Sequence, residues 1–139
     1  ESRLRGKRVI NPDSFVVRRL KSGKLLLLNH EAALPLPGEI MRSNWRERKH
    51  LAAWLSDDDG KSWYGRLMID ERTAVSYPDF AEGEQGFIYV IYDRERVQVG
   101  QVLLARFTEA DIACGEFRTP GGYSRLVVSA FPEKISKQT

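Results

Sequence analysis

Short apolar segments, each bounded by turn residues, follow one another along most of this chain. Segments of this length with Gly, Asp, Asn or Ser between them are typical of β-strands joined by tight turns. One helical segment is predicted at Thr108–Glu116, with Thr108 as its N-cap and Glu109 and Asp111 in its first turn. The pattern predicts eight strands: Phe15–Leu20, Leu25–His30, His50–Ser56, Ser62–Asp70, Ser76–Ala81, Phe87–Asp93, Gln101–Phe107 and Tyr123–Ala130.

The predicted strands form two groups of four, and each group has the short connections of an antiparallel meander. We therefore expect an all-β fold within a single domain over residues 1–139, with one sheet at about 13–71 and the next at about 76–130. β-Sandwiches and β-propellers both have this pattern. The two groups share no obvious repeated sequence, so the pattern of apolar segments alone does not distinguish a sandwich from a propeller.

Composition narrows the classes of partner. The chain is 42% hydrophobic and 29% charged, with 22 basic and 19 acidic residues, so its net charge of +3 does not by itself indicate nucleic-acid binding. No apolar run, Leu25–Leu28 included, is long enough to span a membrane. Cys114 is the single cysteine and cannot form an internal disulfide, so the compartment stays unknown.

The stretch SDDDGKSW, Ser56–Trp63, places three carboxylates between two predicted strands. Aspartate side chains accept hydrogen bonds from nearby backbone amides, and Gly60 supplies the positive φ of a tight turn. A metal site would need further converging ligands, and the sequence has no histidine cluster to provide them. We expect an ordered hairpin with the Trp63 ring folded over it, and neither a metal nor a cofactor.

The same stretch resembles the Asp-box of sialidases and other BNR-repeat propellers, Ser-x-Asp-x-Gly-x-Thr-Trp. Ser56, Asp58, Gly60 and Trp63 match that pattern, and Ser62 replaces the threonine. In that family the box is a structural hairpin between the third and fourth strands of a blade. The resemblance implies that this chain forms two blades of a six-bladed β-propeller, and so only part of a domain.

Three further segments are similar to the last two blades of bacterial sialidase-like proteins. Arg48, in Arg48-Lys49-His50-Leu51, resembles an arginine of the family's carboxylate-binding triad. Tyr77, in Ser76-Tyr77-Pro78-Asp79, resembles the nucleophilic tyrosine, although Pro78 replaces a small polar residue. Asp93 occupies the position of a glutamate that steadies a triad arginine, and it is one methylene shorter.

Strand counting predicts where these residues lie. In a meander, successive turns alternate between the two ends of the sheet. Arg48 precedes a third strand, Tyr77 begins a first strand and Asp93 ends a second strand, so all three belong at one end. The turn at Ser56–Trp63 belongs at the opposite end.

The resemblance implies a glycoside hydrolase that removes a terminal acidic sugar of the sialic acid type by a retaining mechanism. Tyr77 would be the nucleophile and Arg48 and Asp93 would serve substrate binding; the acid, the base and the other arginines would lie in blades outside this sequence. Two alternatives are open: a non-catalytic carbohydrate-binding propeller, and an enzyme of this fold acting on another glycoside or on a uronic-acid polymer. Bacterial sialidase-like proteins are secreted or periplasmic, so the resemblance implies the same location for this protein.

Two blades cannot close a ring, so we expect the remaining blades on a missing or separate chain, or self-association of three copies. Basic residues surround Trp45 in the segment 42–50, but we expect a solvated loop there and no contact with nucleic acid. Arg18 and Arg19 are adjacent in a predicted strand and point to opposite faces, so one of them needs a partner. We expect that partner to be an Asp or Glu, with a substrate as the alternative. Trp54 is expected in the core.

Overall fold

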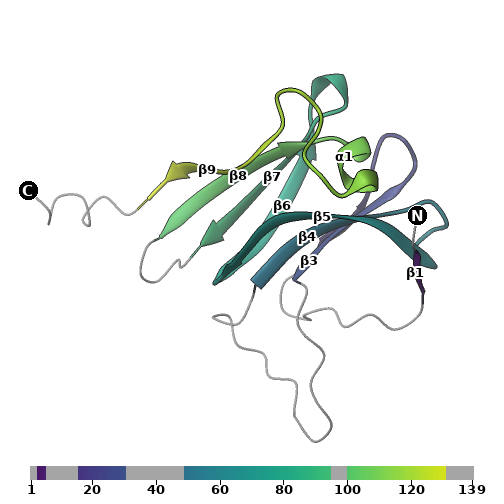
Figure 1. Ribbon diagram of the computed structural model, residues 1–139, viewed down its shortest axis with the longest axis horizontal. Helices are drawn as coiled ribbons and strands as arrows, with labels where there is room; N and C mark the ends of the chain where they lie inside the picture. Colours follow the sequence, from purple (N-terminus) through teal and green to yellow (C-terminus); the bar gives the residue numbers. More distant parts are fainter. Residues whose placement is uncertain (1–2, 6–15, 31–48, 95–99, 131–139) are drawn as a thin grey trace, which may run out of the picture.

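Two antiparallel β-sheets pack face to face (Figure 1). The structure, a computed structural model, describes residues 3–5, 16–30, 49–94 and 100–130. Sheet A has the strand order β1-β5-β4-β3-β2, and sheet B has the order β6-β7-β8-β9. The strands are β1 (Arg3–Arg5), β2 (Val16–Arg19), β3 (Leu25–His30), β4 (Lys49–Ser56), β5 (Ser62–Thr73), β6 (Val75–Glu82), β7 (Ile88–Arg94), β8 (Gln101–Phe107) and β9 (Tyr123–Ser129).

The all-β prediction is confirmed, and the eight predicted strands are β2 to β9. Most ends agree within one residue, but β5 continues three residues beyond the predicted Asp70. The prediction missed β1, which pairs with β5 and aligns Leu4 with Trp63, so sheet A has five strands and not four. Three residues are too few to show a strand period in a sequence.

The core lies between the two sheets. Alternation along each strand directs every second residue into this seam. Sheet A contributes side chains from β3, β4 and β5, while sheet B contributes side chains from β6, β7 and β8. The buried cluster contains Leu26, Leu28, Leu51, Ala53, Leu55, Leu67, Ile69, Val75, Phe80, Ile88, Val90, Tyr92, Leu103, Ala105 and Phe107.

The two sheets differ in how they are covered. The central strands β3 and β4 of sheet A are buried on both faces, because Leu27, Ala52 and Trp54 on the face away from sheet B are also buried. Trp54 therefore belongs to the interior as predicted, and its Nε1 donates to Asn29 Oδ1 over 3.0 Å. On sheet B, β7 alternates between buried and accessible residues, and β9 is largely exposed.

A short helix, α1 (Glu109–Cys114), closes one end of the seam against β5 and β4 (Figure 1). Thr108 caps it as predicted, and its hydroxyl accepts a hydrogen bond from the backbone N–H of Asp111. Asp111 is almost fully buried and accepts from the backbone N–H groups of Arg118 and Thr119, each over 2.9 Å. One carboxylate thus fixes both the helix start and the segment that returns to β9.

Gly65 lets α1 approach β5 closely. Its φ is +74°, and a Cβ on this residue would lie 2.4 Å from the carbonyl oxygen of Ile112. Gly23, in the turn between β2 and β3, has a similar φ of +93° but nothing within 4 Å of its Cβ direction.

These two glycines make a matched pair for substitution. Gly65→Ala should lower the free energy of unfolding by about 3 kcal/mol, since it adds a backbone clash to the cost of positive φ. Gly23→Ala should cost only about 1 kcal/mol, from φ alone. Urea titration of both variants measures the difference, and equal losses would show that the approach of α1 to Gly65 does not matter.

Candidate functional site

The turn between β4 and β5 is held by its own side chains. Ser56 Oγ accepts from the backbone N–H of Gly60 over 2.8 Å and donates to Asp58 Oδ1 over 2.8 Å. Asp58 Oδ1 also accepts from the backbone N–H of Ser62 over 2.8 Å, and Oδ2 accepts from the Ser62 hydroxyl over 2.6 Å. The carboxylate of Asp58 therefore bonds within the hairpin.

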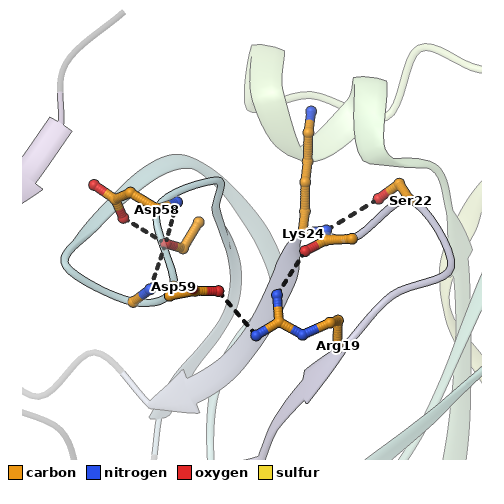
Figure 2. A network of polar contacts seen from close by, with 8 residues as sticks. Arg19, Ser22, Lys24, Asp58 and Asp59 are labelled. Atoms are coloured by element: carbon orange, nitrogen blue, oxygen red, sulfur yellow. Dashed lines mark hydrogen bonds and ion pairs between the residues drawn. The ribbon is translucent and has the colours of Figure 1, made fainter.

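Two further features support the turn. Gly60 has a φ of +86°, as predicted, and a Cβ there would be 3.6 Å from Cζ2 of Trp63, so the ring does cover the turn. Asp59 Oδ1 accepts from Arg19 Nη2 over 2.9 Å, and Arg19 Nη1 donates to the carbonyl oxygen of Gly23 over 2.8 Å (Figure 2). Arg19 thereby joins this turn to the turn between β2 and β3.

The expected acidic partner is present, and both of the adjacent arginines have one. Arg19 pairs with Asp59, and Arg18 pairs with Asp79 over 2.5 Å and lies over the ring of Phe80. The Arg18 contacts link sheet A to the first strand of sheet B. Within the part of the chain that the structure describes, no group of three or more His, Cys, Asp or Glu side chains is placed to hold a metal ion.

The opposite end of the sheets carries the other predicted site residues. The register aligns Ser76 of β6 with Asp93 of β7, so Tyr77 and Asp93 belong to adjacent strands near the same end. Arg48 lies outside the described residues, but the next residue, Lys49, begins β4 and is aligned with Thr73 at that end too. The predicted separation from the turn at Ser56–Trp63 is thus observed for Asp93 and for the backbone of Tyr77.

A polar cluster that the sequence analysis did not predict lies at this end of the seam. Asp70 of β5 is fully buried, and its carboxylate accepts two hydrogen bonds from Arg72, from Nε over 2.8 Å and from Nη2 over 2.6 Å. Tyr92 of β7 donates its hydroxyl to Asp70 Oδ2 over 2.9 Å. This last bond crosses from one sheet to the other.

Arg125 of β9 completes the cluster from the outer edge of sheet B. Its Nη2 pairs with Glu71, and its Nε lies 3.8 Å from Asp70 Oδ1. The cluster therefore contains two carboxylates and two guanidinium groups, so its charges balance. Their placement stabilises the contact between the ends of β5 and β9.

The electrostatics favour a charged Asp70 and a neutral Tyr92. Burial alone would raise the pKa of Asp70, but the hydrogen bonds from Arg72 and Tyr92 outweigh it and hold this pKa below its ordinary value. Burial and the neighbouring Asp70 charge raise the pKa of Tyr92 well above its ordinary value. A phenol that is 2% exposed and reluctant to ionise serves as a hydrogen-bond donor here, not as a nucleophile.

One feature of the sequence hints at part of this cluster. Asp70 and Arg72 are two residues apart on one strand, so their side chains share a face. The contributions of Tyr92 and Arg125 depend on how the two sheets pack, which no local pattern reveals.

Comparisons with known proteins identify no relative. No family model, no curated protein and no solved structure matches the chain. Among the described residues, no helix has the length and apolar character needed to cross a membrane.

The hairpin bonds predict a structural role for Asp58. Asp58→Ala removes the acceptor of the Ser62 amide and hydroxyl, so the free energy of unfolding should fall by about 1 to 3 kcal/mol. Asp59→Asn, in the same turn, is the matched control, because it removes the exposed ion pair with Arg19 and keeps a side chain that tolerates the φ of +58°, so it should cost about 1 kcal/mol or less. Chemical denaturation of the two variants tests this, and a loss for Asp59→Asn as large as that for Asp58→Ala would contradict it.

The depressed pKa of Asp70 predicts a pH dependence of stability. A carboxyl whose folded pKa lies below its unfolded value of about 3.9 stabilises the fold above that pH, and this contribution is lost as pH falls through the folded pKa. Asp70→Asn should cost about 3 kcal/mol at neutral pH, since it leaves Arg72 without its anionic partner. The variant should also lose less stability than the wild type between about pH 4 and pH 2. Denaturant titrations across this range would contradict the role of Asp70 if the two curves stayed parallel.

Proposed function

We propose that this chain is a two-blade sector of a sialidase-like β-propeller that removes a terminal acidic sugar, of the sialic acid type, with retention of configuration. The observation that carries the proposal is the separation of two sets of residues. The hairpin Ser56–Trp63 lies at one end of sheet A, with the Asp-box pattern and a closed set of hydrogen bonds. Tyr77 and Asp93 belong to paired strands at the other end.

The proposed reaction suits a tyrosine. A sialic acid carries a carboxylate on its anomeric carbon, which repels an anionic nucleophile such as aspartate. A base in another blade takes the phenol proton as the oxygen of Tyr77 attacks the anomeric carbon, the bond to the leaving oxygen breaks, and that oxygen receives a proton from a general acid in another blade. Water then cleaves the tyrosyl–sugar bond and restores the phenol. No cofactor takes part.

Arg48 and Asp93 have supporting roles in this proposal. The planar guanidinium of Arg48 donates two parallel hydrogen bonds to the sugar carboxylate. Asp93 steadies an arginine of the same clamp. The remaining arginines, the acid and the base belong to blades on another part of a longer protein or on a separate chain.

A second candidate function is carbohydrate binding without catalysis. One observation favours it: the tyrosine–carboxylate pair that the described residues do form, Tyr92 with Asp70, is closed to solvent and stabilises packing. An assay of the protein that contains this chain separates the candidates. A panel of aryl glycosides with sialosides, uronides and neutral sugars should show turnover of the sialoside for the first candidate and no turnover for the second.

Tyr77→Phe is the direct test of the nucleophile. In an active protein that contains this chain, the substitution keeps the ring and removes the hydroxyl, so kcat should fall by about 10³-fold or more while KM changes little. A value of kcat within a few-fold of wild type would refute the role of Tyr77. The 139-residue chain alone should be inactive, since the acid and the base lie elsewhere.

Arg48→Lys provides the matched specificity control. It keeps the positive charge but loses the two-donor geometry, so KM for acidic sugars should rise by about ten-fold while neutral glycosides are unaffected. An equal effect on acidic and neutral substrates would place Arg48 outside the carboxylate clamp.

A further inference from the structure

Strand β6 has one residue more than its partner β7 at the position of the proposed nucleophile. The register shifts between Ser76 and Asp79, where three steps along β6 match two steps along β7. Tyr77 and Pro78 thus stand together opposite the single residue Tyr92, and this arrangement is a β-bulge. Bulges re-aim side chains and are over-represented next to active sites, so the bulge bears directly on the role of Tyr77.

The bulge decides which residue of β6 faces the seam. Val75 and Phe80 both belong to the buried core, although they are five positions apart and unbroken alternation would put them on opposite faces. Counted forward from Val75, alternation would direct Tyr77 into the seam. Counted back from Phe80, the same place belongs to Pro78. Pro78 is buried, so the proline takes the seam position.

A tyrosine in the seam would be a poor nucleophile. Tyr92 does face the seam, where it is buried and donates its hydroxyl to Asp70. Burial and the charge of Asp70 raise the pKa of Tyr92 well above its ordinary value. The nucleophile of the proposed reaction must instead reach a sugar and give its proton to a base, so Tyr77 needs a place outside the seam.

Both ends of the bulge are tied to sheet A. Before the bulge, the carbonyl oxygen of Val75 lies 2.5 Å from His30 Nε2. After the bulge, Arg18 Nη2 donates to Asp79 Oδ1 over 2.5 Å and also to the carbonyl oxygen of Phe80. The backbone N–H of Phe80 donates to the same Asp79 oxygen over 2.8 Å. These contacts fix the register on both sides, so the extra residue has to stay between Val75 and Asp79.

Proline suits this position. It has no backbone N–H, and within sheets it occurs at edge strands and bulges, as in β6, the edge strand of sheet B. From the bulge and its two anchors, we propose that Pro78 and Arg18 are positioning residues for Tyr77. Pro78 occupies the seam in place of Tyr77, and Arg18 holds the strand that follows the bulge. The inference rests on the proposed role of Tyr77 as the nucleophile.

Arg18→Gln tests the second anchor in an active protein that contains this chain. The Arg18–Asp79 pair is exposed, 49% and 68% for the two side chains, so its loss should leave the protein folded. We expect kcat to fall by about ten-fold or more while KM changes by less than about two-fold, because a small displacement of the reacting group lowers the rate. Arg19→Gln is the matched control: it removes an exposed pair with Asp59 at the opposite end and should leave kcat unchanged.

The same kinetics show which claim fails. Equal losses of kcat in the two arginine variants would overturn the positioning role, and a raised KM with unchanged kcat in Arg18→Gln would make Arg18 a substrate contact instead. Full turnover of Arg18→Gln in a protein that Tyr77→Phe inactivates would refute the positioning role and leave the proposed function standing. Full turnover of Tyr77→Phe would refute both.

Nitration of tyrosines by tetranitromethane, mapped by mass spectrometry, tests Pro78 without any substrate. In the 139-residue chain Tyr77 should react, whereas Tyr64 and Tyr92, both buried, should be protected. Deletion of Pro78 gives β6 and β7 equal lengths here, so Tyr77 should take the seam position and become protected. A wild-type Tyr77 as unreactive as Tyr92, or a Tyr77 that still reacts in a deletion variant with protected Tyr64, would overturn the role of Pro78. If Tyr64 reacts in the deletion variant, that variant is unfolded, and the wild-type reactivity of Tyr77 decides.

Discussion

The packing of sheet A against sheet B is the constraint on which the rest of the structure depends. Ala74 alone separates β5 from β6, with a φ of +62°, so no linker lets the sheets separate. Their apolar faces exclude water along the seam, and a polar group there is costly unless it is bonded. Two polar contacts accordingly cross the seam: His30 Nε2 lies 2.5 Å from the carbonyl oxygen of Val75, and the Tyr92 hydroxyl donates to Asp70.

The parts of the fold that could be predicted are those that local chemistry determines. The strands were predictable because each apolar segment ends at turn residues, and the helix start because Thr108 and Asp111 have cap spacing. Strand parity placed Asp93 and the backbone of Tyr77 at one end. The cluster around Asp70 was not predictable, because Tyr92 and Arg125 reach it from strands whose placement depends on sheet packing.

The two ends of the sheets differ in the length of their connections and in how these are held. At one end, the turns are short and bonded to one another through Arg19, and α1 is locked against Gly65. At the other end, the connection at 31–48 is long in sequence. Long connections on a rigid sheet are where binding and catalytic residues usually lie, because a scaffold can hold them without a local hydrogen-bond pattern of their own. Asp58 and Asp59 belong to the hairpin Ser56–Trp63 at the rigid end, where their carboxylates hold the turns together. Adjacent aspartates in a sequence therefore need not indicate catalysis.

The unequal burial of the two sheets links folding to assembly. The central strands β3 and β4 of sheet A are buried on both faces, whereas sheet B keeps accessible apolar residues, such as Ile91, on the face away from sheet A. In the proposed propeller, a further sheet packs on that face. Only the addition of further blades brings several inner strands around a common axis, which is what a sugar site built from several blades requires. Whether a further blade packs on the face of sheet B that carries Ile91 therefore decides whether Tyr77 and Asp93 can become part of a site built from several blades.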